Sequence, residues 1–478
     1  MKRRYLGLVV VVLGGVALIG STRTTLPAET TTFQTQTPAW MPHASNADVI
    51  TESWFCPGVP ATGQDDVNGA IVIANRSESP LLGTAIIVND RAQNARIDIN
   101  VAGWSTTTID LDATLPGAMV GAIVELEGGG GLVEQQALNA DGDSQAACAT
   151  DTSSEWYLAD GFTVEGSRNQ IVLMNPYEQT VVASLEFATG EITRAPGSYS
   201  GLTVPARSVR VIDLGAPGAG AQSEPRLAVQ VKASQGRLVV GRSQTFLGGG
   251  RLGTQAALAA PALNNQWWFA GGRHDEGYDE EYVIYNPTDD DVEVDAVFLG
   301  IEGIATTDPI LVPGGQVVAF DPDSVTDLPA TRYAAVFATL TGPSVVVERV
   351  TTQNLDGTVA TSVMLGAVAR PDGYLAGTWH VPLSPGAPTA GALSIYNYDD
   401  AEGTISVLAV GPSGPVPIPG LADLPLPPPS SVLVVDLTDP AAVGRELIVQ
   451  TNSRIFVERS FPTGRDDTRS LSWAIPEG

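Results

Sequence analysis

A short tryptophan motif recurs along the chain and sets its organisation. Each copy is a tryptophan followed by small or apolar residues, as in Trp267-Trp268-Phe269-Ala270. The copies begin at Trp54, Trp156, Trp267, Trp379 and Trp473. They stand roughly a hundred residues apart, which is the size of a small domain. Self-similarity at such a period predicts tandem structural repeats.

Three more landmarks follow each of the first four tryptophans in a fixed order. An apolar run ends in asparagine 18 to 21 residues after the tryptophan, at Asn75, Asn175, Asn286 and Asn397. A turn and an alternating run then end in aspartate, at Asp110, Asp213, Asp321 and Asp436. A last apolar run ends in arginine at Arg242, Arg349 and Arg459, whereas the first repeat reads Leu132-Val133-Glu134-Gln135. This constant order predicts four copies of one fold.

The residues between the landmarks indicate the fold class. Each repeat holds about seven short strand-like runs separated by turn signals, and no helix pattern of useful length occurs. The pattern predicts an all-β fold of four tandem immunoglobulin-like antiparallel β-sandwiches. The alternative is a four-unit β-propeller-like array, but units of about 100 to 110 residues are long for four-stranded blades.

The N-terminal segment predicts export. Lys2, Arg3 and Arg4 precede an apolar run over residues 5–20, so residues 1–20 are a signal peptide or, since no clear cleavage site follows, a retained signal anchor. Residues 21–49 are rich in Thr and Pro and predict a disordered stalk. The expected sandwich repeats are then 50–150, 151–262, 263–375 and 376–478, and the last includes a closing tryptophan strand.

The two cysteines of the chain both fall in the first repeat. In an oxidising compartment, Cys56 and Cys148 are expected to form a disulfide rather than a metal site. Such a bond would close a loop of about ninety residues and stabilise the fold by up to about 4 kcal/mol.

The repeated side chains invite both structural and functional interpretations. The tryptophans are expected to be core anchors, and the alternative is an exposed platform that stacks on sugar rings. Each arginine ends an apolar strand face, so it is expected to pair with the aspartate of its own repeat or to stack on the neighbouring tryptophan. The alternative is an exposed arginine at a strand end that pairs with no other side chain. Because Trp473 has no domain after it, each tryptophan strand is expected to pack against the preceding unit.

Catalytic and ligand signals are weak. Of the three histidines, His43, His274 and His380, none stands in a metal-binding or nucleophile pattern, so no catalytic residue, metal site or cofactor is predicted. The Gly-rich stretch 248–253 lacks a strand–turn–helix context and predicts a loop. The acidic stretches 139–143 and 289–291 could ligate calcium, but surface turns are favoured. The net charge of −28 argues against nucleic-acid binding.

With its Trp-x-aliphatic-Ala/Pro starts, Asn-Pro strand ends and Glu-Arg strand ends, the chain resembles a family of exported actinobacterial proteins. That family is catalogued only as a domain of unknown function. The resemblance covers about residues 50 to 478 and implies a cell-envelope setting. It implies no activity and no catalytic residues.

The expected function is that of an extracytoplasmic cell-envelope protein, secreted or anchored to the outer face of the cytoplasmic membrane through residues 5–20. The repeats would form a non-enzymatic scaffold, spacer or binding surface for an unknown envelope protein or polysaccharide. The alternative is a carbohydrate-binding or carbohydrate-processing protein of the bacterial cell wall. Glycoside hydrolysis would require two carboxylates about 5 to 10 Å apart in a cleft.

Overall fold

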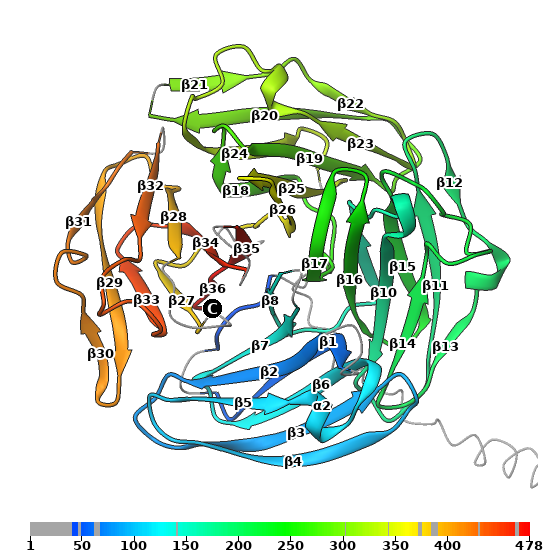
Figure 1. Ribbon diagram of the computed structural model, residues 1–478, viewed down its shortest axis with the longest axis horizontal. Coiled ribbons are helices and arrows are strands. Elements are labelled where there is room, and N and C mark those ends of the chain that lie inside the picture. The colour runs from blue at the N-terminus through cyan, green and yellow to red at the C-terminus, as the bar shows by residue number, and fades with distance from the viewer. Residues whose placement is uncertain are drawn as a thin grey trace, which may run out of the picture. The chain divides into compact units, whose positions relative to one another are not determined.

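Short antiparallel strands make up most of the computed structural model of the protein (Figure 1). The structure describes residues 41–45, 49–61, 67–139, 142–301, 303–342, 344–370, 375–383, 391–428, 431–463 and 468–478. The predicted signal segment and most of the predicted stalk lie outside these residues. The strands form eight antiparallel sheets, two in each repeat, so the prediction of all-β sandwich repeats is confirmed.

The first repeat shows the wiring of the sandwich. Its elements are β1 (Thr51–Ala61), β2 (Asn68–Asn75), β3 (Leu81–Asn89), β4 (Asn94–Val101), β5 (Thr106–Asp110), α2 (Leu111–Thr114), β6 (Gly117–Glu127), β7 (Gly131–Leu138) and β8 (Ser144–Ala147). One sheet has the order β1-β6-β3-β4 and the other β5-β2-β7-β8. We call the first the outer sheet and the second the inner sheet. The repeat therefore has eight strands rather than about seven.

The other repeats follow the same plan with short additional strands. Repeat 2 contains β9 (Glu155–Leu158), η1 (Val164–Gly166), β10 (Arg168–Asn175), β11 (Val181–Ala188), β12 (Thr193–Arg194), η2 (Gly197–Tyr199), β13 (Leu202–Val204), β14 (Ser208–Asp213), β15 (Ala228–Gln235), β16 (Val239–Gly248) and β17 (Arg251–Leu258). Repeat 3 contains β18 (Gln266–Arg273), β19 (Tyr278–Asn286), β20 (Val292–Gly300), β21 (Gly303–Thr306), β22 (Ile310–Val312), β23 (Gln316–Phe320), η3 (Pro322–Ser324), β24 (Arg332–Thr339), β25 (Val346–Leu355) and β26 (Thr358–Leu365). Repeat 4 contains β27 (Thr378–Val381), β28 (Ala392–Asn397), β29 (Gly403–Gly411), β30 (Gly414–Pro417), β31 (Leu424–Leu426), β32 (Val432–Asp436), β33 (Leu447–Thr451), β34 (Ile455–Pro462), β35 (Arg469–Trp473) and β36 (Ile475–Pro476).

Burial differs between the two sheets of a repeat. In the outer sheets, strands such as β11 and β29 alternate between buried and partly exposed residues, as expected when one face meets water. In the inner sheets, strands such as β2 and β7 are buried along nearly their whole length. The middle strands of the inner sheets are therefore covered on both faces, by their own outer sheet and by neighbouring repeats, whereas the edge strands β5, β23 and β32 stay partly exposed.

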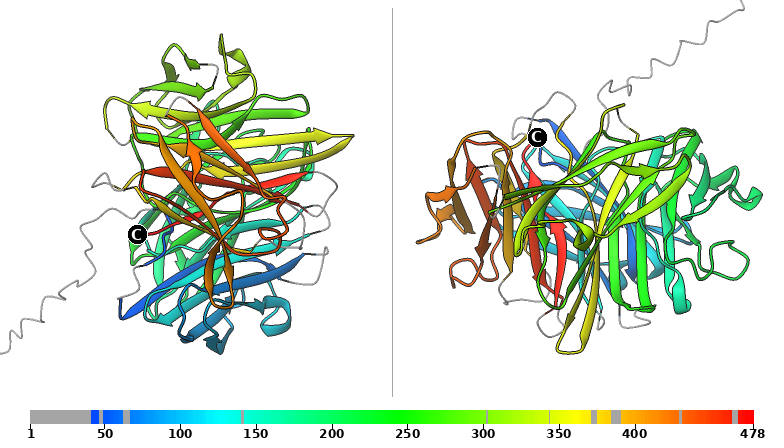
Figure 2. Two further views of the ribbon diagram at one scale, coloured as in Figure 1. Left: turned by 90° about the vertical axis from the view of Figure 1, so that its left-hand side faces the viewer. Right: turned by 90° about the horizontal axis from the view of Figure 1, so that it is seen from above.

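The four repeats close into a ring within the compact unit Ala39–Gly478. The last inner strands meet in turn: β8 contacts β17, β17 contacts β26, β26 contacts β35, and β35 contacts β8. Figure 1 looks along the line around which these four strands gather, and Figure 2 gives the same sandwiches from two further sides. The four sandwich units are thus arranged in a ring, as in the alternative prediction of a four-unit β-propeller-like array.

The end of each repeat returns to its own tryptophan strand. Isolated bridges join Phe55 to Ala149, Tyr157 to Ala260 and Trp268 to Ala367, and in repeat 4 the short strand β36 pairs with β27. Trp473 lies just before this returning segment, at the end of β35. It therefore belongs to the closing strand of repeat 4 and is not equivalent to the other four tryptophans.

The ring is fastened where the two ends of the described chain meet. Ala44 forms a parallel bridge with Glu477, with hydrogen bonds from Ala44 N to Pro476 O (2.8 Å) and from Gly478 N to Ala44 O (2.9 Å). The segment before repeat 1 is thereby attached to the outer sheet of repeat 4. This contact supplements the direct contacts between repeats 4 and 1.

Candidate functional site

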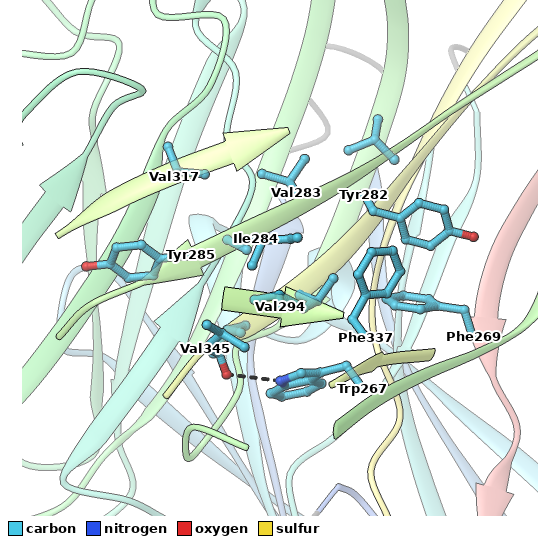
Figure 3. Close-up of a cluster of buried hydrophobic side chains, with 14 of the residues drawn as sticks. Trp267, Phe269, Tyr282, Val283, Ile284, Tyr285, Val294, Val317, Phe337 and Val345 are labelled. Atoms are coloured by element: carbon cyan, nitrogen blue, oxygen red, sulfur yellow. Dashed lines mark hydrogen bonds between the residues drawn. The ribbon is translucent and has the colours of Figure 1, made fainter. Parts of the chain in front are cut away.

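The landmark tryptophans are core residues. Trp54, Trp156, Trp267 and Trp379 are at most 2% exposed. The indole of Trp267 donates to Val345 O (3.0 Å) and lies beneath the aromatic side chains of the repeat 3 core (Figure 3). This burial leaves these four indoles unable to stack on a sugar.

The tryptophan strands also reach the neighbouring repeat, but in the direction opposite to the expected one. Strand β1 contacts β10 and β16 of repeat 2, β9 contacts β25 of repeat 3, and β18 contacts β28 and β34 of repeat 4. The inner sheet that receives each tryptophan strand thus belongs to the following unit. The expectation that each strand packs against the preceding unit is corrected to this extent.

The landmark asparagines all build the same turn. In repeat 3, Asn286 Nδ2 donates to Asp290 O (2.8 Å) and Val312 O (3.1 Å), while its Oδ1 accepts from Thr288 N (3.0 Å). The equivalent bonds occur at the other three positions, and all four side chains are 0% exposed. The side-chain amide of each asparagine pairs with backbone groups that would otherwise have no hydrogen-bond partner in the turn.

Three of the four landmark aspartates cap turns, and none of the four pairs with arginine in the described ranges. Asp110 Oδ1 accepts from Ala113 N (2.9 Å), Asp213 Oδ1 from Gly215 N (3.0 Å) and Asp321 Oδ1 from Asp323 N (2.9 Å). No hydrogen bond or ion pair to an arginine occurs at Asp110, Asp213, Asp321 or Asp436 among the described residues. The expected intra-repeat Arg–Asp pairs are therefore wrong.

The landmark arginines instead form buried ion pairs with a glutamate of the next repeat. Arg242 Nη1 and Nη2 donate to Glu348 Oε2 (3.0 Å) and Oε1 (3.1 Å), and both side chains are 0% exposed. Arg349 pairs in the same way with Glu458, and Arg459 with Glu134. The arginine of repeat 2 thus reaches repeat 3, that of repeat 3 reaches repeat 4, and that of repeat 4 reaches repeat 1. The stacking alternative also fails, because the ring near Arg349 is Phe269 (5.7 Å) rather than a tryptophan.

The glutamates carry a second link across each of two boundaries. Glu348 Oε2 accepts from the backbone N–H groups of Ala159 (2.9 Å) and Asp160 (2.6 Å), at the end of the repeat 2 tryptophan strand. Glu458 Oε2 accepts likewise from Gly271 N (2.9 Å) in repeat 3. These bonds satisfy the carboxylates in a site where an unpaired charge would be very costly.

The boundary between repeats 1 and 2 lacks both members of the pair. Gln135 stands at the arginine position of repeat 1, and Gly241 stands at the glutamate position of repeat 2. Gln135 Oε1 accepts from Gly58 N (3.1 Å), and Pro57 fills the space over Gly241, where an added Cβ would lie 2.7 Å from Pro57 Cγ. The arginine and the glutamate are absent together at this boundary, because either charge alone would be buried without a partner.

The predicted disulfide is present beside this boundary. Cys56 on β1 is bonded to Cys148, which directly follows β8, so the bond ties the outer sheet of repeat 1 to the end of its inner sheet. The bridges Tyr157–Ala260 and Trp268–Ala367 place Leu158 with Ala259, and Phe269 with Gly366, at the equivalent positions. Repeat 1 therefore has a covalent bond where these repeats have apolar contacts.

A second charged cluster lies where repeats 4 and 1 close the ring. Arg76 donates to Ser45 O (2.9 Å) and contacts His380 Nε2 (3.1 Å) and Glu477 (3.5 Å). Burial, and then the charge of Arg76, hold the pKa of His380 well below its usual value. Burial also raises the pKa of nearby Glu446 to about 7, and its Oε1 has no hydrogen-bond partner.

Among the residues that the structure describes, hollows lie between repeats at three places considered in turn. An axial hollow of about 100 Å³ is lined mainly by apolar residues of β8, β17, β26 and β35, together with Met41 and Pro42. A polar hollow of about 240 Å³ between repeats 2 and 3 contains Arg251 and Glu281, which form an ion pair (2.8 Å). A third, of about 40 Å³, lies between repeats 3 and 4 and is also polar. None of the four landmark tryptophans lines any of these hollows.

The histidines and acidic turns do not assemble into a centre in the part of the chain that the structure describes. His274 lies at the surface 2.7 Å from Asp323, His43 bonds to Met41 O, and no group of three metal-ligating side chains occurs in the described ranges. Residues 140–141 of the acidic stretch 139–143 lie outside those ranges. Within the stretch 248–253, only residues 249–250 form a turn, whereas Gly248 ends β16 and residues 251–253 begin β17, so the loop prediction holds only for the turn. No described helix is long and apolar enough to span a membrane.

Comparison with known proteins gives a family match without an activity. Residues 130–241 match the family model described as "Family of unknown function (DUF5719)". The matched stretch begins just before β7 of repeat 1 and ends in β16 of repeat 2, so it crosses a repeat boundary. The expected likeness to a domain of unknown function is confirmed. No curated protein matches the chain.

Solved structures also match the chain, and one of them is similar over a small part of it. It is titled "Crystal Structure of Thermotoga maritima 1070", is 12% identical, and covers 23% of this chain and 95% of that chain, with a TM-score of 0.19. A TM-score this low carries no argument about fold or function.

Proposed function

We propose that this protein is a non-enzymatic scaffold of the cell envelope that presents its outer sheets and loops from a rigid ring. The observation that carries the proposal is the set of three buried Arg–Glu pairs between repeats, Arg242–Glu348, Arg349–Glu458 and Arg459–Glu134. Buried pairs of this kind add little net stability, because desolvation offsets much of their attraction, and we infer that these three fix the geometry of the boundaries instead. A fixed arrangement of four similar units suits a spacer or a binding platform.

Two further features support an extracytoplasmic setting. The Cys56–Cys148 disulfide is typical of an oxidising compartment, and residues 1–20 have the pattern of a signal peptide or signal anchor. The carbohydrate-processing alternative required exposed aromatic residues and paired carboxylates in an open groove. The four landmark tryptophans are buried, which removes the aromatic platform that the repeats would have offered.

The proposal is tested in the native host with the full-length chain carrying a C-terminal tag. We expect the tagged chain in the membrane or secreted fraction, an envelope protein or polysaccharide enriched on it after mild crosslinking, and no release of sugars from purified cell-wall polymers. A matched acidic protein exported by the same signal serves as the control. Recovery of the tagged chain in the cytoplasmic fraction would overturn the proposal. Release of sugars from a cell-wall polymer by the purified chain would overturn it as well.

A further inference from the structure

The polar hollow between repeats 3 and 4 has the features of a built binding site. It has a volume of about 40 Å³ and is enclosed by β18, β24 and β25 on one side and by β28, β34 and β35 on the other. Strand β18 of repeat 3 contacts β28 and β34 of repeat 4 directly (Figure 1). The residues that line the hollow come from both repeats, so it sits inside their boundary. Three arginines line it, Arg273, Arg332 and Arg469, in a chain whose net charge is −28.

Two of these arginines lie directly opposite each other on neighbouring strands. Arg273 on β18 and Arg332 on β24 are cross-strand partners in the antiparallel register. Like charges in directly opposed positions destabilise a sheet. An arrangement of this kind is favourable only when a negative group compensates both charges.

The protein supplies a directly paired negative group to only one of the two, although the charges of Asp275 and Glu280 also act on Arg332. Arg273 pairs with Asp275 and stacks over the ring of Tyr278 (3.6 Å). Arg332 is half-buried, and its side chain has no hydrogen bond or ion pair with any described residue. Burial, and then the charge of Arg273, lower the pKa of Arg332. Arg332 lines the hollow, and its side chain is unpaired there.

The acidic residues of the lining are already engaged elsewhere. Glu458 pairs with the fully buried Arg349, and Glu280 accepts from the hydroxyl of Tyr333 (2.9 Å) and lies 3.9 Å from the same arginine. Arg349 Nε and Nη1 are nevertheless buried without a hydrogen-bond partner. Buried N–H groups of a guanidinium are normally satisfied by an acceptor, and each one left unpaired is costly.

The third arginine is positioned from the opposite repeat. Arg469 N donates to Gln353 Oε1 (2.8 Å), and Gln353 Nε2 donates to Arg469 O (2.6 Å). This pair of bonds fixes the backbone of Arg469 at the rim of the hollow. Ser394 and Ser460 of repeat 4 add hydroxyl groups to the lining.

We propose that this hollow binds a single oxyanion group, a carboxylate or a phosphate, held chiefly by Arg332 with Arg273 and Arg469. The planar guanidinium forks match such groups geometrically, and charge-assisted hydrogen bonds to them are stronger than neutral ones. The hollow is roomy enough for a small polar group, because about 10 to 15 Å³ of such space already holds one water molecule. The inference holds whether or not the ring is a scaffold.

The test is calorimetric titration of the full chain at constant ionic strength, with sodium chloride as the reference salt. Inorganic phosphate represents one source of the group and glucuronate the other. We expect saturable binding of at least one of them, and a loss of affinity of roughly tenfold or more in Arg332→Gln, the scale set by one charge-assisted hydrogen bond. Arg96→Gln is the matched control, because Arg96 is exposed and lies 3.8 Å from Asp98 on the same strand. It should bind like the parent chain.

The result of the two titrations distinguishes the two possible sources of the anion. Binding of phosphate alone assigns the site to a phosphate group, and binding of glucuronate alone assigns it to an acidic sugar. No saturable binding of either anion above chloride, or equal binding by parent and Arg332→Gln, overturns the proposal. Should Arg332→Gln not fold, the parent chain crystallised in phosphate decides, because the anion must then lie between Arg273 and Arg332.

Discussion

The Arg242–Glu348 pair offers the sharpest test of how the ring is held together. We consider Arg242→Met and Glu348→Gln. Both side chains are 0% exposed, joined by two hydrogen bonds of 3.0 and 3.1 Å. Arg242→Met leaves the Glu348 carboxylate with the backbone donors of Ala159 and Asp160 but without a counter-charge. Glu348→Gln leaves the guanidinium with a single neutral carbonyl, Asp160 O, and an amide.

Breaking one side of a buried pair costs about 3–5 kcal/mol, because the remaining charge is buried and uncompensated. Each single substitution should therefore lower the free energy of unfolding by that amount. The double substitution removes both charges and should cost clearly less than the sum of the single costs, which gives a coupling energy of about 2 kcal/mol or more. The matched control is the exposed pair Arg207–Glu178 (2.9 Å) of repeat 2, for which the same cycle should give about 0–1 kcal/mol.

The assay is equilibrium unfolding in urea, followed by tryptophan fluorescence and far-ultraviolet circular dichroism. Coincident transitions justify a single free energy. Hydrogen exchange at the amides of Ala159 and Asp160 adds a local readout, because both donate to Glu348. A cost below about 1 kcal/mol for Arg242→Met, or a coupling energy near zero, would refute the view that this pair fixes the boundary.

Three further perturbations test other contacts of the ring. Burial raises the pKa of Glu446 from 4.5 to about 7, so its contribution to stability is present below pH 4.5 and is lost as the pH rises through 7. The loss amounts to at most about 3 kcal/mol. Glu446→Gln should remove this pH-dependent loss, which is measured as the free energy of unfolding from pH 4 to 8. Replacing Cys56 and Cys148 by alanine should lower stability by up to about 4 kcal/mol, because the bond closes a 92-residue separation; denaturant unfolding with and without reductant measures it, and equal midpoints would contradict the estimate. Deleting residues 470–478 removes all of β35 except Arg469, all of β36 and the bridge between Ala44 and Glu477, so repeat 4 should lose about 3 kcal/mol or more. An unchanged calorimetric melting profile would show that this C-terminal segment does not stabilise repeat 4.

The repeat architecture could be read from the sequence because its signals are local. The apolar runs, the turn after each asparagine and the returning tryptophan all lie within about a hundred residues and recur in one frame. The Cys56–Cys148 disulfide followed from composition and compartment. The sandwich prediction rests on such local periodicity, which can be detected in a single sequence.

The ring and its ion pairs could not be predicted in the same way. Arg242 and Glu348 are 106 residues apart, and Arg459 and Glu134 are 325 apart, so no local pattern joins them. A clue was nevertheless present: each repeat with the arginine is followed around the ring by a repeat with the glutamate, and both are missing at Gln135 and Gly241. The aspartates attracted attention because they recur, but they recur as turn caps. The arginines around the small hollow were not singled out, because they occur in only one boundary.

The direction of the ion pairs has a consequence for shortened forms of the protein. Each pair is a head-to-tail contact, and contacts of that kind give closed rings when the rotation closes and open filaments when it does not. A chain that lacked repeat 4 would expose Arg349 at one end and Glu134 at the other, each complementary to the partner on a second molecule. Truncation would therefore convert an intramolecular closure into self-association that depends on protein concentration. The four-repeat chain avoids this outcome because its last arginine finds its glutamate in its own first repeat.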